Sequence, residues 1–481
     1  MADTAVKRSV VSTSEDIVRE RFEPLRRAYV RTPFLSYAER CAHLDALSDL
    51  LRSNQETIAQ AIADDFGGRS IHETRLAEIF LPVAAIRYIR SHLRAWMKSQ
   101  PRRVPLSFQF GSAKVVYQPL GVVGIIAPWN YPFHLAVMPA AFALAAGNRV
   151  LLKPSELTPH TAELLRKLVS ERFNHEVMSV VTGGRDVAEA FSKLPFDHIF
   201  FTGSTQVGRI IMKAAAENLV PVTLELGGKS PTIVHESFPV QLAATRIAFG
   251  KWCNAGQTCI APDYVLISEG RRDALVEQLV RVTRKSYPRI RDNPDYTSIV
   301  SMRHYERLRA LVADAEERGA RKIEMKADDE EIPDQAHRLP PTLLLDVRDD
   351  MKVMQDEIFG PILPIMTYRS LDEAIVYVNQ HPRPLALYYF DSDRARSRDV
   401  LLRTTSGGVG LNNIALHSFV DDLPFGGVGP SGMGAYHSFD GFETFSHKKG
   451  VFVQSRLNAT GLLAPPYGER LNRLLSMLIG A

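Results

Sequence analysis

The fold is decided by Gly121-Val122-Val123-Gly124-Ile125-Ile126-Ala127, a short apolar run without a charged residue. Such a run predicts a strand that is buried on both faces, as in the middle of a parallel sheet. Comparable runs follow at residues 150–152, 177–181 and 198–201, and helical patterns lie between them. Alternating strands and helices predict an α/β fold with a parallel sheet, which binds ligands beyond the carboxyl ends of its strands.

A second α/β region is predicted from residue 224 onward. Its expected elements are strands at 232–234, 264–267, 358–368 and 385–390, a helix at 271–287, and surface loops at 318–333 and 421–434. On the other side of the central run, residues 14–65 and 72–98 carry helical patterns. Prolines then interrupt the chain, and residues 108–117 between them predict an extended arm.

The composition is that of a globular chain of 481 residues, 45% hydrophobic and 23% charged. The net charge of +4 predicts no nucleic-acid binding. The start of the chain does not resemble a signal peptide, and no stretch approaches the roughly 20 apolar residues that span a bilayer. The three cysteines, Cys41, Cys253 and Cys259, argue against a disulfide framework and favour a cytoplasmic location. No metal site is predicted.

Residues 471–481 place apolar side chains at helical spacing. We expect a tail helix that packs on its own or a neighbouring subunit. Weak membrane contact is the alternative, with Arg470 and Arg473 as the only cationic support.

Cys259 is the first candidate catalytic residue. Most lone cysteines are small buried hydrophobic side chains. Here Gly256-Gln257-Thr258 precedes the cysteine, and such a turn can present both the thiol and its backbone N–H to a pocket. A nucleophilic cysteine needs exposure and a lowered pKa.

Glu225 and Asn130 are the next two candidates. Glu225 ends an apolar run and precedes Gly227-Gly228, so it is either a surface residue or a desolvated general base. Asn130 follows the first predicted strand, where it either forms a turn or donates its amide to an oxyanion.

Phosphate binding is suggested by residues 201–208, Phe-Thr-Gly-Ser-Thr-Gln-Val-Gly, which follow a strand and lead into a helical pattern. The spacing differs from that of the common dinucleotide fingerprint, so the motif alone is weak evidence. Lys153 and Glu156 end another strand and are either solvated or bonded to ribose hydroxyls.

Together these stretches resemble the aldehyde dehydrogenase superfamily from about residue 15 to about residue 455. The matching motifs occur in order at 128–130, 153–156, 201–204, 225–229, 256–259 and 357–361. Finer features, at 218–225, 261–264, 412–417 and 424–434, resemble class 3 enzymes and especially the coniferyl aldehyde dehydrogenase group. The resemblance implies a Rossmann-type cofactor domain, an α/β catalytic domain and a small β oligomerisation arm.

The resemblance also implies a role for each matching residue. Cys259 would be the nucleophile that forms a thiohemiacetal and then a thioester, Glu225 the general base, and Asn130 an oxyanion donor. The implied cofactor-binding residues are Trp129, Lys153, Glu156, Gly203, Ser204, Gly208, Leu226, Glu357 and Phe359. The cofactor would be NAD, with NADP possible, because Glu156 favours a free ribose hydroxyl while Lys153 partly offsets its charge.

The substrate would be an aromatic aldehyde such as coniferyl aldehyde, or a medium- to long-chain aliphatic one. Tyr131, Trp252 and His417 are the expected walls of its tunnel. Trp252-Cys253 departs from the Phe or Met more common in relatives, which puts the shape of the tunnel in question. Cys253 is either a bystander or an oxidative trap for Cys259.

The expected domains are a cofactor domain at 1–99 and 119–224, a catalytic domain at 225–416, a bridging element at 100–118 and 417–455, and a tail at 456–481. The bridging element would join two copies in a homodimer. Two other functions remain open: an acylating enzyme in which coenzyme A resolves the thioester, and a non-catalytic binding protein on the same fold. Glu225 argues against the first, and the intact candidate triad argues against the second.

Overall fold

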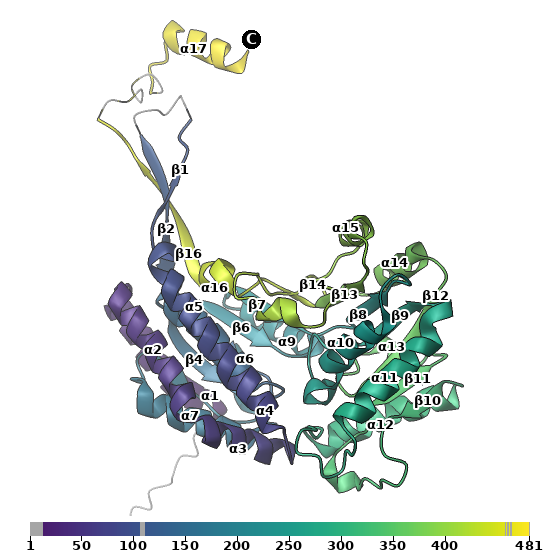
Figure 1. Ribbon diagram of the computed structural model, residues 1–481. Coiled ribbons are helices and arrows are strands. Elements are labelled where there is room, and N and C mark those ends of the chain that lie inside the picture. The colour runs from purple at the N-terminus through teal and green to yellow at the C-terminus, as the bar shows by residue number, and fades with distance from the viewer. Residues whose placement is uncertain (1–12, 106–110, 457, 459–460, 462–463, 481) are drawn as a thin grey trace, which may run out of the picture.

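The computed structural model describes residues 13–105, 111–456, 458, 461 and 464–480. Two sheets stand side by side with helices around each, and a narrow arm projects from one of them (Figure 1). The α/β fold expected from the apolar runs is confirmed.

The first sheet has six strands in the order β15-β7-β6-β3-β4-β5. Its strands are β3 (Val122–Ile126), β4 (Arg149–Lys153), β5 (Met178–Val180), β6 (His198–Thr202), β7 (Val222–Glu225) and β15 (Gly432–Met433). The first five are parallel, and β15 pairs antiparallel with β7. The short β15 lies within the predicted loop at 421–434, so that prediction is wrong at this one place, where the loop returns to the sheet edge.

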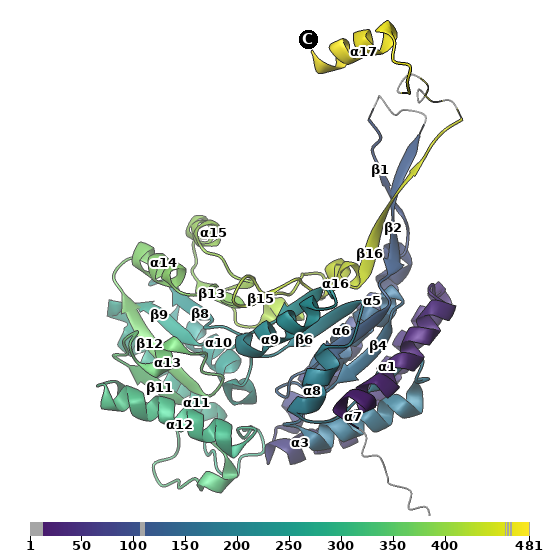
Figure 2. The same ribbon diagram turned by 180° about the vertical axis from the view of Figure 1, so that it is seen from behind.

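Helices cover both faces of this sheet (Figures 1 and 2). They are α1 (Ser14–Arg31), α2 (Tyr37–Ser53), α3 (Gln55–Phe66), α4 (Ile71–Thr74), α5 (Leu81–Trp96), α6 (His134–Ala146), α7 (Pro159–Arg172), α8 (Arg185–Ser192) and α9 (Thr205–Ala216). Val123 and Ile125 of β3 join the core under α2, α5 and α6, whereas Val122 and Ile126 join the core under α1 and α8. The central strand is therefore buried on both faces, as its sequence predicts.

The helical pattern at 72–98 is not one helix. A π-helical segment, Arg75–Phe80, separates α4 from α5. It places Glu78 in the interior, where the carboxylate pairs with Arg69 and accepts hydrogen bonds from the backbone N–H groups of Phe133 and His134. The start of α6, immediately after Asn130, is thereby fixed.

The second sheet has seven strands in the order β10-β11-β12-β9-β8-β13-β14. They are β8 (Pro231–Val234), β9 (Tyr264–Ser268), β10 (Arg321–Glu324), β11 (Thr342–Leu345), β12 (Ile362–Tyr368), β13 (Ala386–Phe390) and β14 (Gly408–Leu411). All are parallel except β10, which is antiparallel to β11. The predicted loop at 318–333 therefore contains an edge strand, and the strand predicted at 358–368 begins only at Ile362.

Helices surround this second sheet as well (Figures 1 and 2). They are α10 (Val240–Trp252), α11 (Arg272–Ser286), α12 (Met302–Glu317), α13 (Lys352–Gln355), α14 (Leu371–Gln380) and α15 (Arg394–Arg403). The helix expected at 271–287 matches α11 closely.

The arm is a three-stranded antiparallel sheet in the order β1-β2-β16. Its strands are β1 (Gln100–Arg102), β2 (Ser112–Pro119) and β16 (Ser446–Val453), and α16 (Ser438–Thr444) leads into it. Of the predicted extended segment at 108–117, residues 108–110 lie outside the described residues and the rest runs into β2. The tail forms α17 (Glu469–Ile479) beyond the arm, where Leu471 is buried but Met477 and Ile479 are exposed (Figure 1).

Candidate active site

Two cavities meet at Cys259. The larger, of about 450 Å³, is a cleft between the two sheets, lined by Asn130, Glu225 and Glu357 among others. The smaller, of about 110 Å³, is mostly apolar and is lined by residues such as Leu76 and Phe249. Cys259 lines both, so its thiol lies where a ligand in the cleft and a ligand in the apolar cavity meet.

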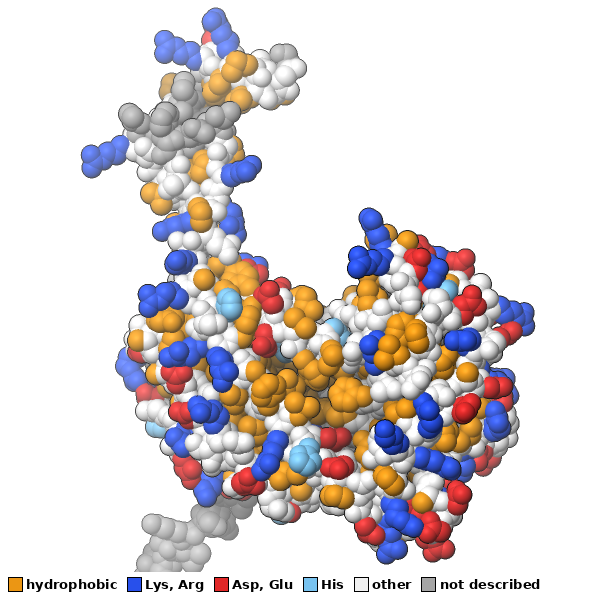
Figure 3. All heavy atoms as spheres, in the orientation of Figure 1, with side chains coloured by type: hydrophobic (Ala, Val, Ile, Leu, Met, Phe, Trp, Pro, Cys, Tyr) orange, Lys and Arg blue, Asp and Glu red, His pale blue; other side chains and the backbone are white. Residues whose placement is uncertain are grey.

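The apolar cavity lies between the two sheets. Apolar side chains gather in the hollow between the two halves of the molecule (Figure 3). Among the large apolar side chains left exposed are Leu76, Phe249 and Phe419, which also line the cavity. The structure therefore provides an apolar route from the surface toward Cys259.

A strained turn positions Cys259. After α10 the backbone of Asn254, Ala255 and Gly256 is left-handed, with φ of 51°, 50° and 72°. A methyl group at Gly256 would lie 2.3 Å from the carbonyl oxygen of Gly360, so only glycine fits there. The Gln257 amide donates to the carbonyls of Asn254 and Ser298 and accepts from the N–H of Val300, which holds the turn in place.

The Cys259 thiol is half-buried in this turn. Burial raises its pKa to about 12, with a further contribution from the nearby Glu357 and Glu225 carboxyls, while backbone N–H groups oppose the shift. A nucleophilic role would require the opposite shift, so the lowered thiol pKa that such a role needs stays a prediction for the protein with its ligands bound.

Glu225 ends β7, where Gly432 of β15 lies opposite it. Its side chain is buried and lines the cleft, and neither carboxyl oxygen has a hydrogen-bond partner among the residues that the structure describes. Burial alone raises its pKa well above the usual value. A buried carboxyl without partners is set up to bind a water molecule or a ligand that enters the cleft.

Asn130 follows β3 of the first sheet and bonds to the turn that carries Cys259. Its side-chain N–H donates to the carbonyl oxygen of Gln257 over 3.1 Å, and its own backbone carbonyl accepts from Arg69 and from the Asn254 amide. An amide nitrogen carries two hydrogens, so one remains for a ligand. Asn130 lines the cleft beside Cys259, and the three catalytic candidates thus share one cavity.

The predicted phosphate loop borders the same cleft. Gly203 and Ser204 line it, and Ser204 caps α9 by accepting from the N–H of Val207. Gly208 lies one turn further on, where a methyl group would approach the Leu226 side chain to 2.7 Å. Leu226 itself lines the cleft, so this glycine lets α9 pack close behind it.

The remaining cofactor candidates fall into two groups. Trp129, Glu357 and Phe359 line the cleft, and the Trp129 ring packs edge-on against Phe359 at 5.3 Å. Glu357 is half-buried and its carboxylate lies against Gly227; desolvation there raises its pKa to about 8. Lys153 and Glu156 pair with each other over 3.3 Å but do not line the cleft; the lysine is buried and the glutamate exposed.

Of the three residues predicted to wall the substrate tunnel, the structure brings one to the apolar cavity. Tyr131 lines the apolar cavity and shares a hydrogen bond with Thr258 over 2.8 Å. Trp252 does not line the apolar cavity: it lies in the hydrophobic core around the second sheet, where its indole N–H donates to Thr283. His417 does not line the cavity either, because its ring packs against Tyr388 and Phe425, and its neighbours Ser418 and Phe419 take that place.

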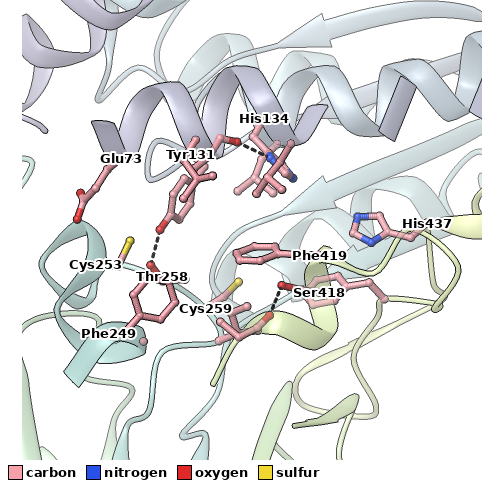
Figure 4. A pocket seen from close by; sticks show the side chains of 18 of the residues that line it. Glu73, Tyr131, His134, Phe249, Cys253, Thr258, Cys259, Ser418, Phe419 and His437 are labelled. Carbon is pink, nitrogen blue, oxygen red and sulfur yellow. Dashed lines mark hydrogen bonds between the residues drawn. The ribbon is translucent and has the colours of Figure 1, made fainter. Parts of the chain in front are cut away.

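Several residues that line the two cavities carry no signal in the sequence. His304 and Arg307 of α12 face the cleft, and the arginine donates to the backbone carbonyls of Glu357 and Ile358. The apolar cavity also includes Glu73, His134, Phe249, Phe419 and His437, and it includes Cys253, which the sequence had marked as unusual (Figure 4). They come from five separate segments that only the tertiary structure brings together.

Nearly the whole sequence is similar to known aldehyde dehydrogenases. A model of the aldehyde dehydrogenase family matches residues 5–451. The chain is 53% identical over 457 residues to a probable coniferyl aldehyde dehydrogenase of Pseudomonas aeruginosa, covering 95% of each. It is 38% identical over 465 residues to aldehyde dehydrogenase family 3 member B1 of Mus musculus, covering 96% of this chain and 97% of that one.

Solved structures agree. The substrate-bound state of Staphylococcus aureus AldH superimposes with a TM-score of 0.90 at 39% identity, covering 96% of this chain and 99% of that one. An NAD-dependent aldehyde dehydrogenase from Sinorhizobium meliloti gives a TM-score of 0.84 at 31% identity, covering 93% of this chain and 88% of the other. The similarity thus extends over nearly the whole chain.

Proposed function

The chain belongs to the aldehyde dehydrogenase family, and from that premise we propose that it oxidises aromatic aldehydes of the coniferyl type to carboxylic acids with NAD. The observation that carries the proposal is the position of Cys259, which lines both the polar cleft and the apolar cavity. The similarity to coniferyl aldehyde dehydrogenases supports the substrate class, and so do the aromatic walls Tyr131, Phe249 and Phe419.

The cleft fits a dinucleotide. Its volume leaves space for a ligand of that size. The N-terminus of α9 beside it and the Glu225 carboxyl, which has no partner among the described residues, provide polar groups for that ligand. We assign Gly203 and Ser204 to the phosphates, Glu357 to the nicotinamide ribose, and Lys153 with Glu156 to the adenosine ribose. When bound, the nicotinamide supplies the acceptor for the hydride that leaves the aldehyde carbon.

The first half of the reaction uses Cys259 and Asn130. The thiol gives up its proton to solvent water, the sulfur adds to the aldehyde carbon, and the C=O electron pair moves to the carbonyl oxygen, which becomes an alkoxide. The free Asn130 N–H and the Cys259 backbone N–H stabilise this oxygen; such a donor typically contributes about 100- to 1000-fold in rate. Loss of hydride from the carbon leaves a thioester on Cys259.

The second half uses Glu225. Its carboxylate removes a proton from a water molecule, the hydroxide attacks the thioester carbon, and the sulfur departs as the acid forms. A buried carboxyl with no hydrogen-bond partner suits this role, because no group in the described part of the chain competes with water for it. The presence of this base favours hydrolysis over transfer to coenzyme A.

The test is product analysis. The purified protein is incubated with coniferyl aldehyde and NAD, and acid formation is followed by chromatography with and without coenzyme A. We expect the free acid in both cases, and a higher kcat/KM for aromatic than for aliphatic aldehydes. A coenzyme A ester as the main product, or no turnover of any aldehyde, would contradict the proposal.

Assembly and location belong to the same proposal. We propose a homodimer joined through the arm and a cytoplasmic location. All three cysteines are free, which suits a reducing compartment. In the described part of the chain no helix is long and apolar enough to cross a membrane.

A further inference from the structure

The polar side chains of the apolar cavity are mostly occupied by protein partners. Glu73 accepts from the backbone N–H of Asn254 and from the Thr297 hydroxyl. Tyr131 and Thr258 bond to each other, and the Ser418 hydroxyl donates to the carbonyl of Ala415. The two histidines that line the cavity are different. The Nε2 of His437 is buried without a partner among the described residues, and the one ring-nitrogen contact of His134 in that part of the chain is made by its Nδ1 (Figure 4).

His134 presents a hydrogen-bond acceptor. It begins α6, and its Nδ1 lies 2.8 Å from the carbonyl oxygen of Ala77. A carbonyl oxygen only accepts, so Nδ1 carries the proton. Burial lowers the pKa of His134, so the ring is neutral and Nε2 is left as a bare acceptor. Such an atom in an apolar cavity calls for a ligand with an O–H or N–H group.

His437 is held at a cost in backbone energy. It is 9% exposed and its Nε2 is buried without a partner. Its backbone has a φ of 74° and a ψ of 160°, a combination normally reserved for glycine. Its ring stacks on Phe425, and burial lowers its pKa to about 3, so it too is neutral. Strain of this kind in a cavity wall is typical of a residue placed for a ligand.

We propose that His134 and His437 form a hydroxyl-binding subsite that selects aldehydes with a phenolic ring. The phenolic O–H donates to Nε2 of His134, and the Nε2–H of His437, in the tautomer protonated at that atom, donates to an oxygen substituent on the aromatic ring. The apolar walls around them bury the ring itself. This inference rests on the proposed function and names the residues that would recognise the phenolic hydroxyl of its substrate.

The subsite can be tested by measuring aldehyde binding to a catalytically inactive variant, so that no turnover occurs. Cys259→Ala is titrated calorimetrically with 4-hydroxycinnamaldehyde and with cinnamaldehyde, which differ by one hydroxyl. We expect the hydroxylated ligand to bind about tenfold more tightly or better. Equal affinities would overturn the inference even if the wild-type enzyme oxidises both, whereas absent wild-type turnover would instead count against the proposed function.

Two substitutions at His134 separate recognition from folding. In His134→Asn the amide N–H replaces Nδ1 opposite Ala77 but nothing replaces Nε2. In His134→Gln the longer amide places an oxygen near the Nε2 position. The affinity ratio is the affinity for 4-hydroxycinnamaldehyde divided by that for cinnamaldehyde. We expect this ratio to fall toward one in His134→Asn and to be restored in His134→Gln. Restoration by Asn and not by Gln would assign His134 a structural role and overturn the inference.

A second site and a control complete the test. His437→Phe keeps the stacking on Phe425 and removes both ring nitrogens, so we expect the affinity ratio to fall by about threefold or more. The matched control is His72→Asn, because His72 is exposed on α4 and does not line the cavity. An affinity ratio unchanged in His437→Phe would remove this residue from the subsite and overturn the pairing.

Discussion

Cys259 is held as a neutral thiol, and its reactivity should depend steeply on pH. An ordinary cysteine has a pKa of about 8.5, whereas burial raises that of Cys259 to about 12. Below its pKa the thiolate fraction rises tenfold per pH unit. In the protein without cofactor we therefore expect the alkylation rate of Cys259, followed by peptide mass spectrometry, to increase about tenfold per unit from pH 7 to pH 10. A plateau below pH 10 would show that the cavity lowers the thiol pKa instead.

Glu225 should matter after hydride transfer and not before it. In Glu225→Gln the buried amide keeps the shape of the carboxyl but cannot take a proton from water. We expect steady turnover to fall about 100-fold or more while a rapid first burst of NADH persists. Cys259→Ala, in contrast, should abolish both phases. Rapid-mixing absorbance separates the two, and a variant that loses the burst but keeps normal turnover would exclude Glu225 as the base.

Single site residues could be predicted from the sequence where they lie in a recognisable motif, and could not be predicted where they do not. Cys259, Glu225 and Asn130 are each marked by an unusual local pattern, and the fold brings all three to one cleft. Trp252 is misassigned because adjacency to Cys253 in the chain says nothing about the direction of its ring, which points to Thr283. His134 and Arg307 lie on helices without a motif, so only the packing reveals them.

Elements with one clear physical cause were predictable. β3 is apolar on both faces because cores lie on both sides of it. β10 was missed because Arg321–Glu324 is a charged edge strand, and edge strands do not carry the apolar signature of central ones. The π-helical segment was missed because one extra residue in a helix hardly alters the apolar periodicity. The site depends on that segment, since Glu78 fixes the start of α6.

The turn between α10 and Cys259 depends on Gly256. In Gly256→Ala the added methyl would meet the Gly360 carbonyl at 2.3 Å, in backbone that is left-handed. The turn must then shift, and even a displacement of about 1 Å can cost about 100-fold in rate. We expect that loss in kcat, together with a lower melting temperature. Gly270→Ala is the control, because a methyl group there meets nothing within 4 Å. Equal behaviour of the two variants would refute the tight-turn argument.

The whole molecule places its chemistry between two sheets. Residues of the first sheet supply Glu225 and the phosphate loop, and the second region supplies Cys259 and Glu357. Neither half holds a complete site, so the relative position of the two sheets sets the distance from thiol to cofactor. That relation was not predictable from local patterns, which describe each sheet alone. Only the resemblance to the family indicated that the two sheets face a common site.

The arm gives the last prediction. A three-stranded sheet that projects from the body buries little apolar surface alone, and its outer strand β16 has no neighbour on one side among the described residues. Phe452 and Val453 of β16 are about half exposed. We therefore expect the protein to sediment as a dimer, and Phe452→Asp to shift it toward the monomer. Leu402→Asp, on the exposed face of α15, is the matched control and should remain dimeric. If the wild-type protein is monomeric at micromolar concentration, or if the two variants dissociate equally, the arm does not join the subunits.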